Sequence, residues 1–312
     1  MVELNITLPE HFLEEETRDG YTIPAEMKKV WAVELDLYLE FDRICKKHHI
    51  PYTVSGGTLL GAIRHNGFIP WDDDIDLELL REDYETFLRV APSELKFPYF
   101  LQTEKTDPGF VGPNAKLRNS LTTGILKKEL PKHYSFNQGI FIDLFPLDTV
   151  VSDPARLEKQ AEDILKYQKL FRKGERAYHN YTPSPGNALK KLYKSTVHKI
   201  LTGPLVHGRN VFLPYVEKRD RACTRYNDQT SEPLVGKLLL RPKDKRLHLY
   251  REDLNDIILH DYEFLQVPVM RNYDRALTMH FGDYMKPVRD ASYHGGVVFD
   301  TNIPYSEYFK TH

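Results

Sequence analysis

The chain has 312 residues, of which 41% are hydrophobic and 28% are charged, a composition typical of a globular protein of one large or two moderate domains. Its formal net charge of -2 and pI near 6.7 exclude a general attraction to nucleic acid or to an anionic membrane, so an anionic partner would need a local basic pocket. Its two isolated cysteines exclude a disulfide scaffold, and the acidic N-terminus and lack of a run of about 18 apolar residues predict a cytoplasmic protein without a transmembrane segment.

The first predicted elements lead into a glycine turn. Apolar residues three or four apart predict an amphipathic helix over residues 24–49. A short strand at 52–54 then runs into Gly56 and Gly57, and the following residues predict a short helix that ends at the Asn66-Gly67 turn.

Strands dominate the next part of the chain. Ile75, Leu77 and Leu79 alternate with acidic residues, which predicts a strand with one apolar and one acidic face, followed by a helix over 81–90. The nearly unbroken apolar run at 139–148 is typical of a buried central strand. Shorter strands are predicted at 98–103, 112–119 and 121–126.

The rest of the chain suggests an α/β protein in three segments. Residues 153–227 are predominantly helical and basic, interrupted by PSPG at 183–186. Strands are predicted at 234–240 and 264–267, and a helix at 273–281. We therefore predict a catalytic core over 24–150, a helical insertion or second lobe over 151–230, and a segment over 231–312 that completes the core and the acceptor side.

Three carboxylates are the strongest candidates for chemistry. Asp74 and Asp76 are two apart on a predicted strand, so their side chains leave the same face and could bind one divalent cation or a metal pair. Asp143 lies within the buried run, where a shared cation would relieve the cost of burying its charge. Oxygen-only ligands favour Mg²⁺ or Mn²⁺, and this set predicts phosphoryl or nucleotidyl transfer. The alternatives are an acidic turn for residues 72–76 and a loop-capping role for Asp143.

The glycine turn has the features of a phosphate-binding segment, although it matches neither the Walker A nor the dinucleotide-binding motif. Gly56 and Gly57 would allow close backbone approach, while helix N–H groups and the Ser55 and Thr58 hydroxyls would donate to an anion. The basic candidates for the same pocket are Arg64, Lys116 and Arg118, although a lone Lys or Arg is more often a solvated surface charge, so proximity to the acidic site must decide their role.

These motifs resemble the LicD family of phosphotransferases, which is also similar to fukutin and the fukutin-related proteins. The resemblance rests on GTLLGAIRHNGFIPWDDDIDL, GIFIDLFPLD and YEFLQVPVMRNYDRALTMHFGDYMKP, and covers about residues 30–150 and 260–295. It implies a nucleotidyltransferase-like mixed sheet flanked by helices, with Asp74, Asp76 and Asp143 holding magnesium and Asp72 as a further candidate ligand. Asp283 and His294 would lie on the acceptor side, against ordinary surface or capping roles for both.

The implied reaction is transfer of phosphocholine from CDP-choline, or of ribitol or glycerol phosphate from its CDP derivative, to a hydroxyl of a cell-surface glycan precursor, with release of CMP. Such an acceptor, as in lipopolysaccharide or teichoic acid, would place the enzyme at the inner face of the membrane. Asp143 would be the first candidate for the base that accepts the acceptor proton. The rival hypotheses are transfer of NMP from an NTP with release of pyrophosphate, and a binding protein without catalysis.

A choline cargo would need aromatic faces, because its quaternary ammonium makes no ordinary hydrogen bond. Trp71 is the large aromatic residue nearest to the acidic strand, although it could simply pack beneath the PWDD turn. The other candidates are Tyr99, Phe110, Tyr134 and Phe136.

Overall fold

The computed structural model describes residues 1–110, 112–132, 134–179, 213–288 and 296–311, with the backbone alone for 173–179. Its helices are α1 (Ala25–His48), α2 (Gly56–His65), α3 (Arg81–Glu94), α4 (Pro154–His179), α6 (Leu213–Cys223), α7 (Tyr273–Phe281) and α8 (Tyr305–Thr311). Its strands are β1 (Glu16–Arg18), β2 (Tyr21–Ile23), β3 (Thr53–Val54), β4 (Asp76–Leu80), β5 (Tyr99–Gln102), β6 (Ala115–Asn119), β7 (Thr123–Leu126), β8 (Ile140–Val150), β9 (Leu234–Gly236), β10 (His248–Tyr250), β11 (Ile257–Tyr262), β12 (Leu265–Met270) and β13 (Val297–Asp300).

The long strand β8 organises the main sheet, which has seven strands among the described residues. It pairs with β4 in parallel, with β6 antiparallel along its first half and with β9 antiparallel at its end. The strands β3, β5 and β10 extend the sheet from β4, β6 and β9. All eleven residues of β8 are buried, as expected for a strand covered on both faces. The predicted mixed α/β class is thereby confirmed.

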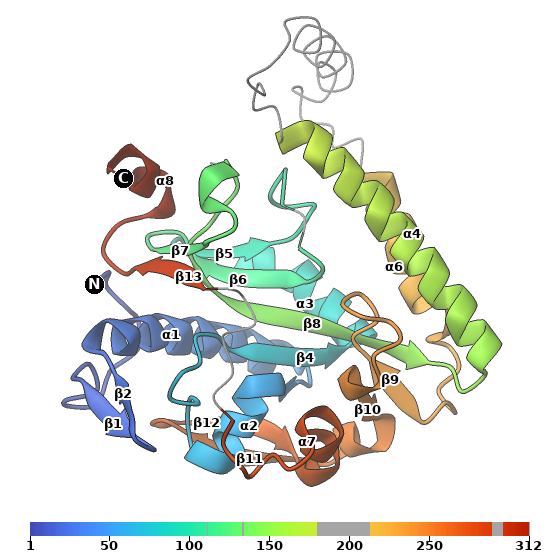
Figure 1. Cartoon of the computed structure of the whole chain (residues 1–312), viewed down its shortest axis with the longest axis horizontal. Coiled ribbons are helices and arrows are strands. Elements are labelled where there is room, and N and C mark those ends of the chain that lie inside the picture. The colour runs from blue at the N-terminus through green and yellow to red at the C-terminus, as the bar shows by residue number, and fades with distance from the viewer. Residues whose placement is uncertain (111, 133, 180–212, 289–295, 312) are drawn as a thin grey trace, which may run out of the picture.

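Two amphipathic helices cover one face of this sheet. Both α1 and α3 contact β8, and they also contact each other through Phe41 and Phe87, whose ring centroids are 4.6 Å apart. In Figure 1, α1 runs along the sheet and α3 lies beside it. One large apolar core joins these helices to β4 and β8, and it includes the fully buried Trp31 of α1. The core therefore fixes α1 rigidly against the strands that carry the acidic residues.

The C-terminal part of the chain returns to the N-terminal strands. The hairpin of β11 and β12 lies beside β3, where the Thr53 hydroxyl donates to the carbonyl of Pro268 at 3.2 Å. The helix α7 packs against α2, and β13 pairs with β7. Residues distant in sequence therefore surround the glycine turn and the acidic strand.

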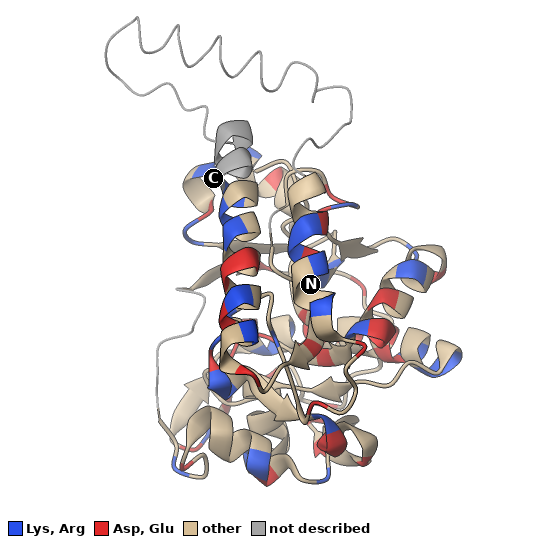
Figure 2. Cartoon of the chain, turned by 90° about the vertical axis from the view of Figure 1, so that its right-hand side faces the viewer, with Lys and Arg blue, Asp and Glu red and all other residues tan. Residues whose placement is uncertain are grey.

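The helices α4 and α6 pack side by side and project beyond the end of β8 (Figure 1). Gln160 of α4 donates from Nε2 to the carbonyls of Ala222 and Cys223 at 3.0 Å each. Basic and acidic residues are interspersed along this pair (Figure 2). The PSPG stretch lies outside the described residues, and the division of the chain at 150 and 230 stays a prediction. Within the described ranges, no helix is long and apolar enough to cross a membrane.

Most predicted elements occur within a few residues of their expected bounds, but two predictions need correction. A strand was expected over 234–240, yet β9 ends at Gly236, because Lys237 and Leu238 turn and the Leu238 N–H bonds to the Gly236 carbonyl at 2.9 Å. The acidic strand was expected to begin at Asp74, but β4 begins at Asp76, where its pairing with β8 starts opposite Asp143. The elements that the sequence analysis did not identify are β1, β2, β10, β11, β13 and α8.

A buried ion pair at the end of β8 generates a stability prediction. Arg81 donates from Nε to Asp148 Oδ1 at 2.8 Å and from Nη2 to Oδ2 at 2.5 Å, and Asp148 is fully buried. Asp148→Asn would leave the buried guanidinium without its anion, so we expect a loss of about 3–5 kcal/mol in unfolding free energy, measured by urea denaturation. The exposed Asp256–Arg271 pair is the control, since Asp256→Asn should cost less than about 1 kcal/mol; equal losses in the two variants would contradict the prediction.

Candidate active site

The parallel pairing of β4 and β8 brings the predicted carboxylates together. Asp76 is the register partner of Asp143, and Asp74 lies two residues before Asp76. One carboxylate oxygen from each of these three residues lies within 4.8 Å of the other two. Asp74 belongs to a second such group with Asp72 and Asp73. The site is therefore a continuous run of carboxylates from Asp72 to Asp143.

Two helices hold the acidic segment in place. From α1, Trp31 Nε1 donates to the carbonyl of Asp72 at 3.1 Å. From α2, the buried Thr58 hydroxyl accepts a hydrogen bond from the Asp76 N–H at 2.8 Å. The backbone between these anchors continues the strand alignment, because the Asp143 N–H donates to the Ile75 carbonyl at 2.8 Å. The carboxylates consequently stand on a backbone fixed at both ends.

The two glycines of the turn make space for these carboxylates. Gly56 has φ of +52°, and a Cβ there would lie 3.0 Å from Asp76 Oδ2. A Cβ on Gly57 would overlap Asp72 Oδ2. A side chain at Gly57 would displace Asp72 and one at Gly56 would crowd Asp76, so the carboxylates favour glycine here in addition to any phosphate that the turn could approach.

Lys116 contacts the acidic site, as the sequence suggested, whereas the hydrogen bonds of Arg118 go to residues outside that site. Lys116 Nζ and Asn114 Nδ2 both donate to Asp143 Oδ1 at 2.5 Å. Burial lowers the pKa of Lys116, and Asp143 opposes that lowering. Arg118 is buried with its guanidinium on Gln102 Oε1 and on the carbonyl of Gly139, and burial lowers its pKa to about 10.

Lys237 is a second buried cation at the site, and the sequence analysis missed it. Its Nζ lies 2.9 Å from Glu78 Oε1 and donates to Ser55 Oγ at 2.7 Å, while Ser55 Oγ donates to Glu78 at 2.6 Å. Burial alone would lower the pKa of Lys237, but Glu78, Asp76 and Asp143 outweigh it and raise the pKa. The Ser55 hydroxyl hydrogen is therefore directed to Glu78, although it was predicted to bind phosphate.

Glu34 of α1 is the other functional candidate that the sequence did not reveal. Its side chain is 1% exposed, and its Oε2 has no hydrogen-bond partner in the described part of the chain. Burial raises the pKa of Glu34 well above its usual range, with further contributions from Asp74, Asp73, Asp72 and Asp143. The sequence showed only that Glu34 lies in an amphipathic helix. That pattern does not indicate which residues a buried glutamate would contact.

The remaining predicted residues lie elsewhere. Arg64 donates from Nη1 to the Tyr284 carbonyl at 2.6 Å, so it contacts the GDYM segment, where Asp283 is exposed. His294 lies outside the described residues. The predicted aromatic residues lie in three separate places. Trp71 packs near Tyr21, and the Tyr99 hydroxyl donates to Asp36. The other three predicted residues form a separate cluster of Phe110, Tyr134 and Phe136.

These residues fit a divalent cation. The donor set consists of carboxylate oxygens, which magnesium and manganese prefer. The unpartnered Glu34 oxygen and the glycine-lined space beside Asp72 and Asp76 indicate that the carboxylates are arranged for something other than one another. Asp74, Asp76 and Asp143 would be the principal ligands, with Asp72 as a further one.

The glycine turn allows a direct test of this arrangement. We expect Gly56→Ala to reduce the rise in melting temperature that Mg²⁺ or Mn²⁺ causes, because the added Cβ would lie 3.0 Å from Asp76 Oδ2 and would push this ligand atom out of place. Gly20→Ala is a matched control, since Gly20 also has a positive φ, of +68°, but nothing within 4 Å of a Cβ. Both variants carry backbone strain, so a normal metal response in Gly56→Ala would contradict the role given to this glycine.

A half-buried histidine near Lys237 gives a pH prediction. Burial lowers the pKa of His280 to about 4, and Lys237 adds to the lowering. In the unfolded chain this histidine has a pKa near 6.5, so between about pH 6.5 and pH 4 the unfolded chain binds a proton and the folded chain does not. The free energy of unfolding therefore falls as the pH drops from about 6.5 to about 4. Urea denaturation across this range should show a steeper loss for the native chain than for His280→Gln. Parallel curves would show that His280 titrates normally.

The chain is similar to known proteins over much of its length. Residues 49–179 match the family described as LicD/FKTN/FKRP, nucleotidyltransferase domain. The chain is 28% identical over 271 residues to the lipopolysaccharide cholinephosphotransferase LicD of Haemophilus influenzae, covering 83% of this chain and 91% of that protein. It is also 29% identical over 109 residues to an uncharacterised Rickettsia prowazekii protein, covering 32% of this chain and 40% of that one. The matched family domain contains every carboxylate from Asp72 to Asp143, and over most of its length the chain is similar to a lipopolysaccharide cholinephosphotransferase.

Proposed function

We propose that this enzyme transfers a phospho-alcohol, in the first place phosphocholine from CDP-choline, to a hydroxyl of a cell-surface glycan precursor and releases CMP. The observation that carries the proposal is the convergence of Asp74, Asp76 and Asp143 across the β4–β8 pair. The similarity to a lipopolysaccharide cholinephosphotransferase supports the choice of cargo and of acceptor class.

Magnesium or manganese bound by Asp74, Asp76 and Asp143 would supply positive charge to the diphosphate of the donor and to the leaving CMP. The protein would contribute mainly position. The first N–H groups of α2 receive no side-chain cap from Ser55, so this helix end can donate to a phosphate beside the carboxylates. Lys237, which is bonded to Ser55 and Glu78, adds a fixed positive charge beside this helix end.

The hydrogen bonds of Asp143 favour a ligand role over the role of base that the sequence suggested. Its Oδ1 accepts from both the Lys116 ammonium and the Asn114 amide, and both contacts favour the charged form of a carboxylate. Such an anion is a good metal ligand and a weak proton acceptor. We therefore assign Asp143 to the metal and leave the acceptor proton to another group.

Substitution of a single aspartate tests the metal site. Asp74→Asn or Asp76→Asn keeps the volume and removes one ligand charge, so we expect a loss of CMP release of at least about 100-fold, as for removal of one group that stabilises transition-state charge. Circular dichroism should show an unchanged fold, and Asp256→Asn, on the exposed surface, should retain full activity. Full activity in Asp76→Asn would overturn the metal assignment.

The products distinguish the proposed reaction from its rival. Incubation with CDP-choline and a glycan acceptor should release CMP, EDTA should abolish that release, and added Mg²⁺ or Mn²⁺ should restore it. Pyrophosphate release from CTP, without CMP release from any CDP-alcohol, would instead show nucleotidyl transfer.

A further inference from the structure

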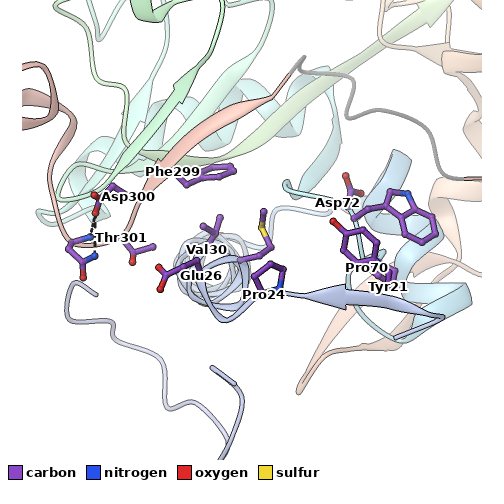
Figure 3. Close-up of a pocket in the computed structure, with 12 residues that line it drawn as sticks. Tyr21, Pro24, Glu26, Val30, Pro70, Asp72, Phe299, Asp300 and Thr301 are labelled. Carbon is purple, nitrogen blue, oxygen red and sulfur yellow. Dashed lines mark hydrogen bonds between the residues drawn. The ribbon is translucent and has the colours of Figure 1, made fainter. Parts of the chain in front are cut away.

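A pocket of about 320 Å³ adjoins the acidic site at Asp72. Figure 3 shows Phe299 of β13 above Val30 of α1, with Tyr21 and Asp72 across from them and Pro24 between the two sides. Trp71 extends the Tyr21 side, because the two rings meet edge to face at 5.9 Å. The lining residues are Tyr21, Pro24, Glu26, Met27, Val30, Pro70, Trp71, Asp72, Phe299, Asp300, Thr301 and Asn302. We call this space the aromatic–acidic pocket.

The charge of this lining favours a cation. Glu26, Asp72 and Asp300 contribute three carboxylates, and the lining contains neither lysine nor arginine. Two of the three are already balanced in part: Lys29 contacts Glu26 at 2.6 Å, and the N–H groups of Asn302 and Ile303 donate to Asp300. Asp72 likewise accepts the Asp73 N–H at 3.2 Å, so all three carboxylates have partners and the lining as a whole stays negative, with Asp72 at the end nearest to the metal candidates.

The rest of the lining favours a cation that makes no hydrogen bonds. Three aromatic rings, two prolines, a valine and a methionine provide apolar and polarisable surface. A polyol cargo would need a donor or an acceptor for each hydroxyl, whereas a trimethylammonium group is attracted by aromatic faces and by a nearby carboxylate. The rings and the carboxylates thus favour a quaternary ammonium, whereas Thr301 and Asn302 are the uncharged polar side chains that this lining offers to a polyol.

The position of the pocket fits the geometry of a phosphocholine group. Asp72 lines the pocket and also belongs to the carboxylate group with Asp73 and Asp74, and Asp74 in turn belongs to the group with Asp76 and Asp143. In phosphocholine the ammonium is joined to the phosphate by a single ethylene unit. A phosphate near the Asp74 end would therefore direct the ammonium toward Asp72 and the aromatic rings.

We propose that the aromatic–acidic pocket binds the quaternary ammonium of the donor's alcohol, with Trp71, Tyr21 and Phe299 as its aromatic walls and Asp72 as its counter-charge. This assignment rests on the proposed phosphotransfer and identifies which cargo the site selects. It also moves the cargo site away from the cluster of Phe110, Tyr134 and Phe136, which does not line this pocket.

The test measures selection between two donors in the full-length enzyme with Mg²⁺. Wild type should use CDP-choline with a higher kcat/KM than CDP-ribitol, and Trp71→Leu and Phe299→Leu should each reduce that ratio by at least about fivefold, the scale of one cation–π contact. Trp71→Phe should restore most of the ratio because it keeps an aromatic face. Phe264→Leu is the matched control, since Phe264 is a half-buried aromatic residue that packs on Phe12 and lies outside this pocket.

Several results would overturn the assignment while leaving phosphotransfer intact. One is metal-dependent CMP release with an unchanged donor ratio in both leucine variants. Another is a wild-type preference for CDP-ribitol that is lost in Thr301→Val, since the buried Thr301 hydroxyl has no partner among the described residues and a polyol would engage it.

Binding of a cation without a nucleotide separates failure of the pocket from failure of the proposed function. Tetramethylammonium should bind to the metal-free chain by calorimetry and should bind at least about fivefold more weakly to Trp71→Leu. This result together with no CMP release from any CDP-alcohol would reject the phosphotransfer but support the pocket. Equal binding to wild type and Trp71→Leu would reject the pocket.

Discussion

The parallel pairing of β4 with β8 is the constraint on which the rest of the site depends. The register that sets Asp76 beside Asp143 also buries Leu77 and Leu144 in the core, so the acidic cluster cannot separate without a slip of the central sheet. Packing therefore enforces a charge repulsion that the carboxylates alone would avoid. The structure holds these groups together in advance, as a preorganised site for a multivalent cation requires.

The concentrated negative charge is balanced from three directions. Lys116 reaches Asp143 from β6, Lys237 is held by Glu78 below the glycine turn, and burial together with the aspartates disfavours the charged form of Glu34 on α1. Lys237 and Glu34 are buried and the Lys116 side chain is 13% exposed, so interactions between these charges are strong and poorly screened by salt. A divalent cation would add the missing positive charge at the centre of this arrangement.

The same acidic run also links the chemistry to cargo selection. The run lies beside the uncapped start of α2, where a diphosphate would find N–H donors. Asp72, whose carboxylate lies against Gly57 of that helix start, also lines the aromatic–acidic pocket at one end of the run. The intervening backbone is tied to α1 through Trp31 and to α2 through Thr58, so the distance between the two ends is fixed by the packing of these helices.

The sequence by itself determined the α/β class, the bounds of α1 and α7, the buried strand β8 and the convergence of Asp74, Asp76 and Asp143. Each follows from a local pattern, namely helical spacing, strand alternation, or an ionised residue inside an apolar run, which reports burial and face without knowledge of distant partners. Only the tertiary structure revealed the roles of Lys237 and Glu34 and the hydrogen bond from the Ser55 hydroxyl to Glu78. It alone also placed Phe299 and Tyr21 in the lining of one pocket. Those residues come from segments far apart in the chain, and contacts between such segments depend on how helices and strands pack in three dimensions, which no local period or motif encodes.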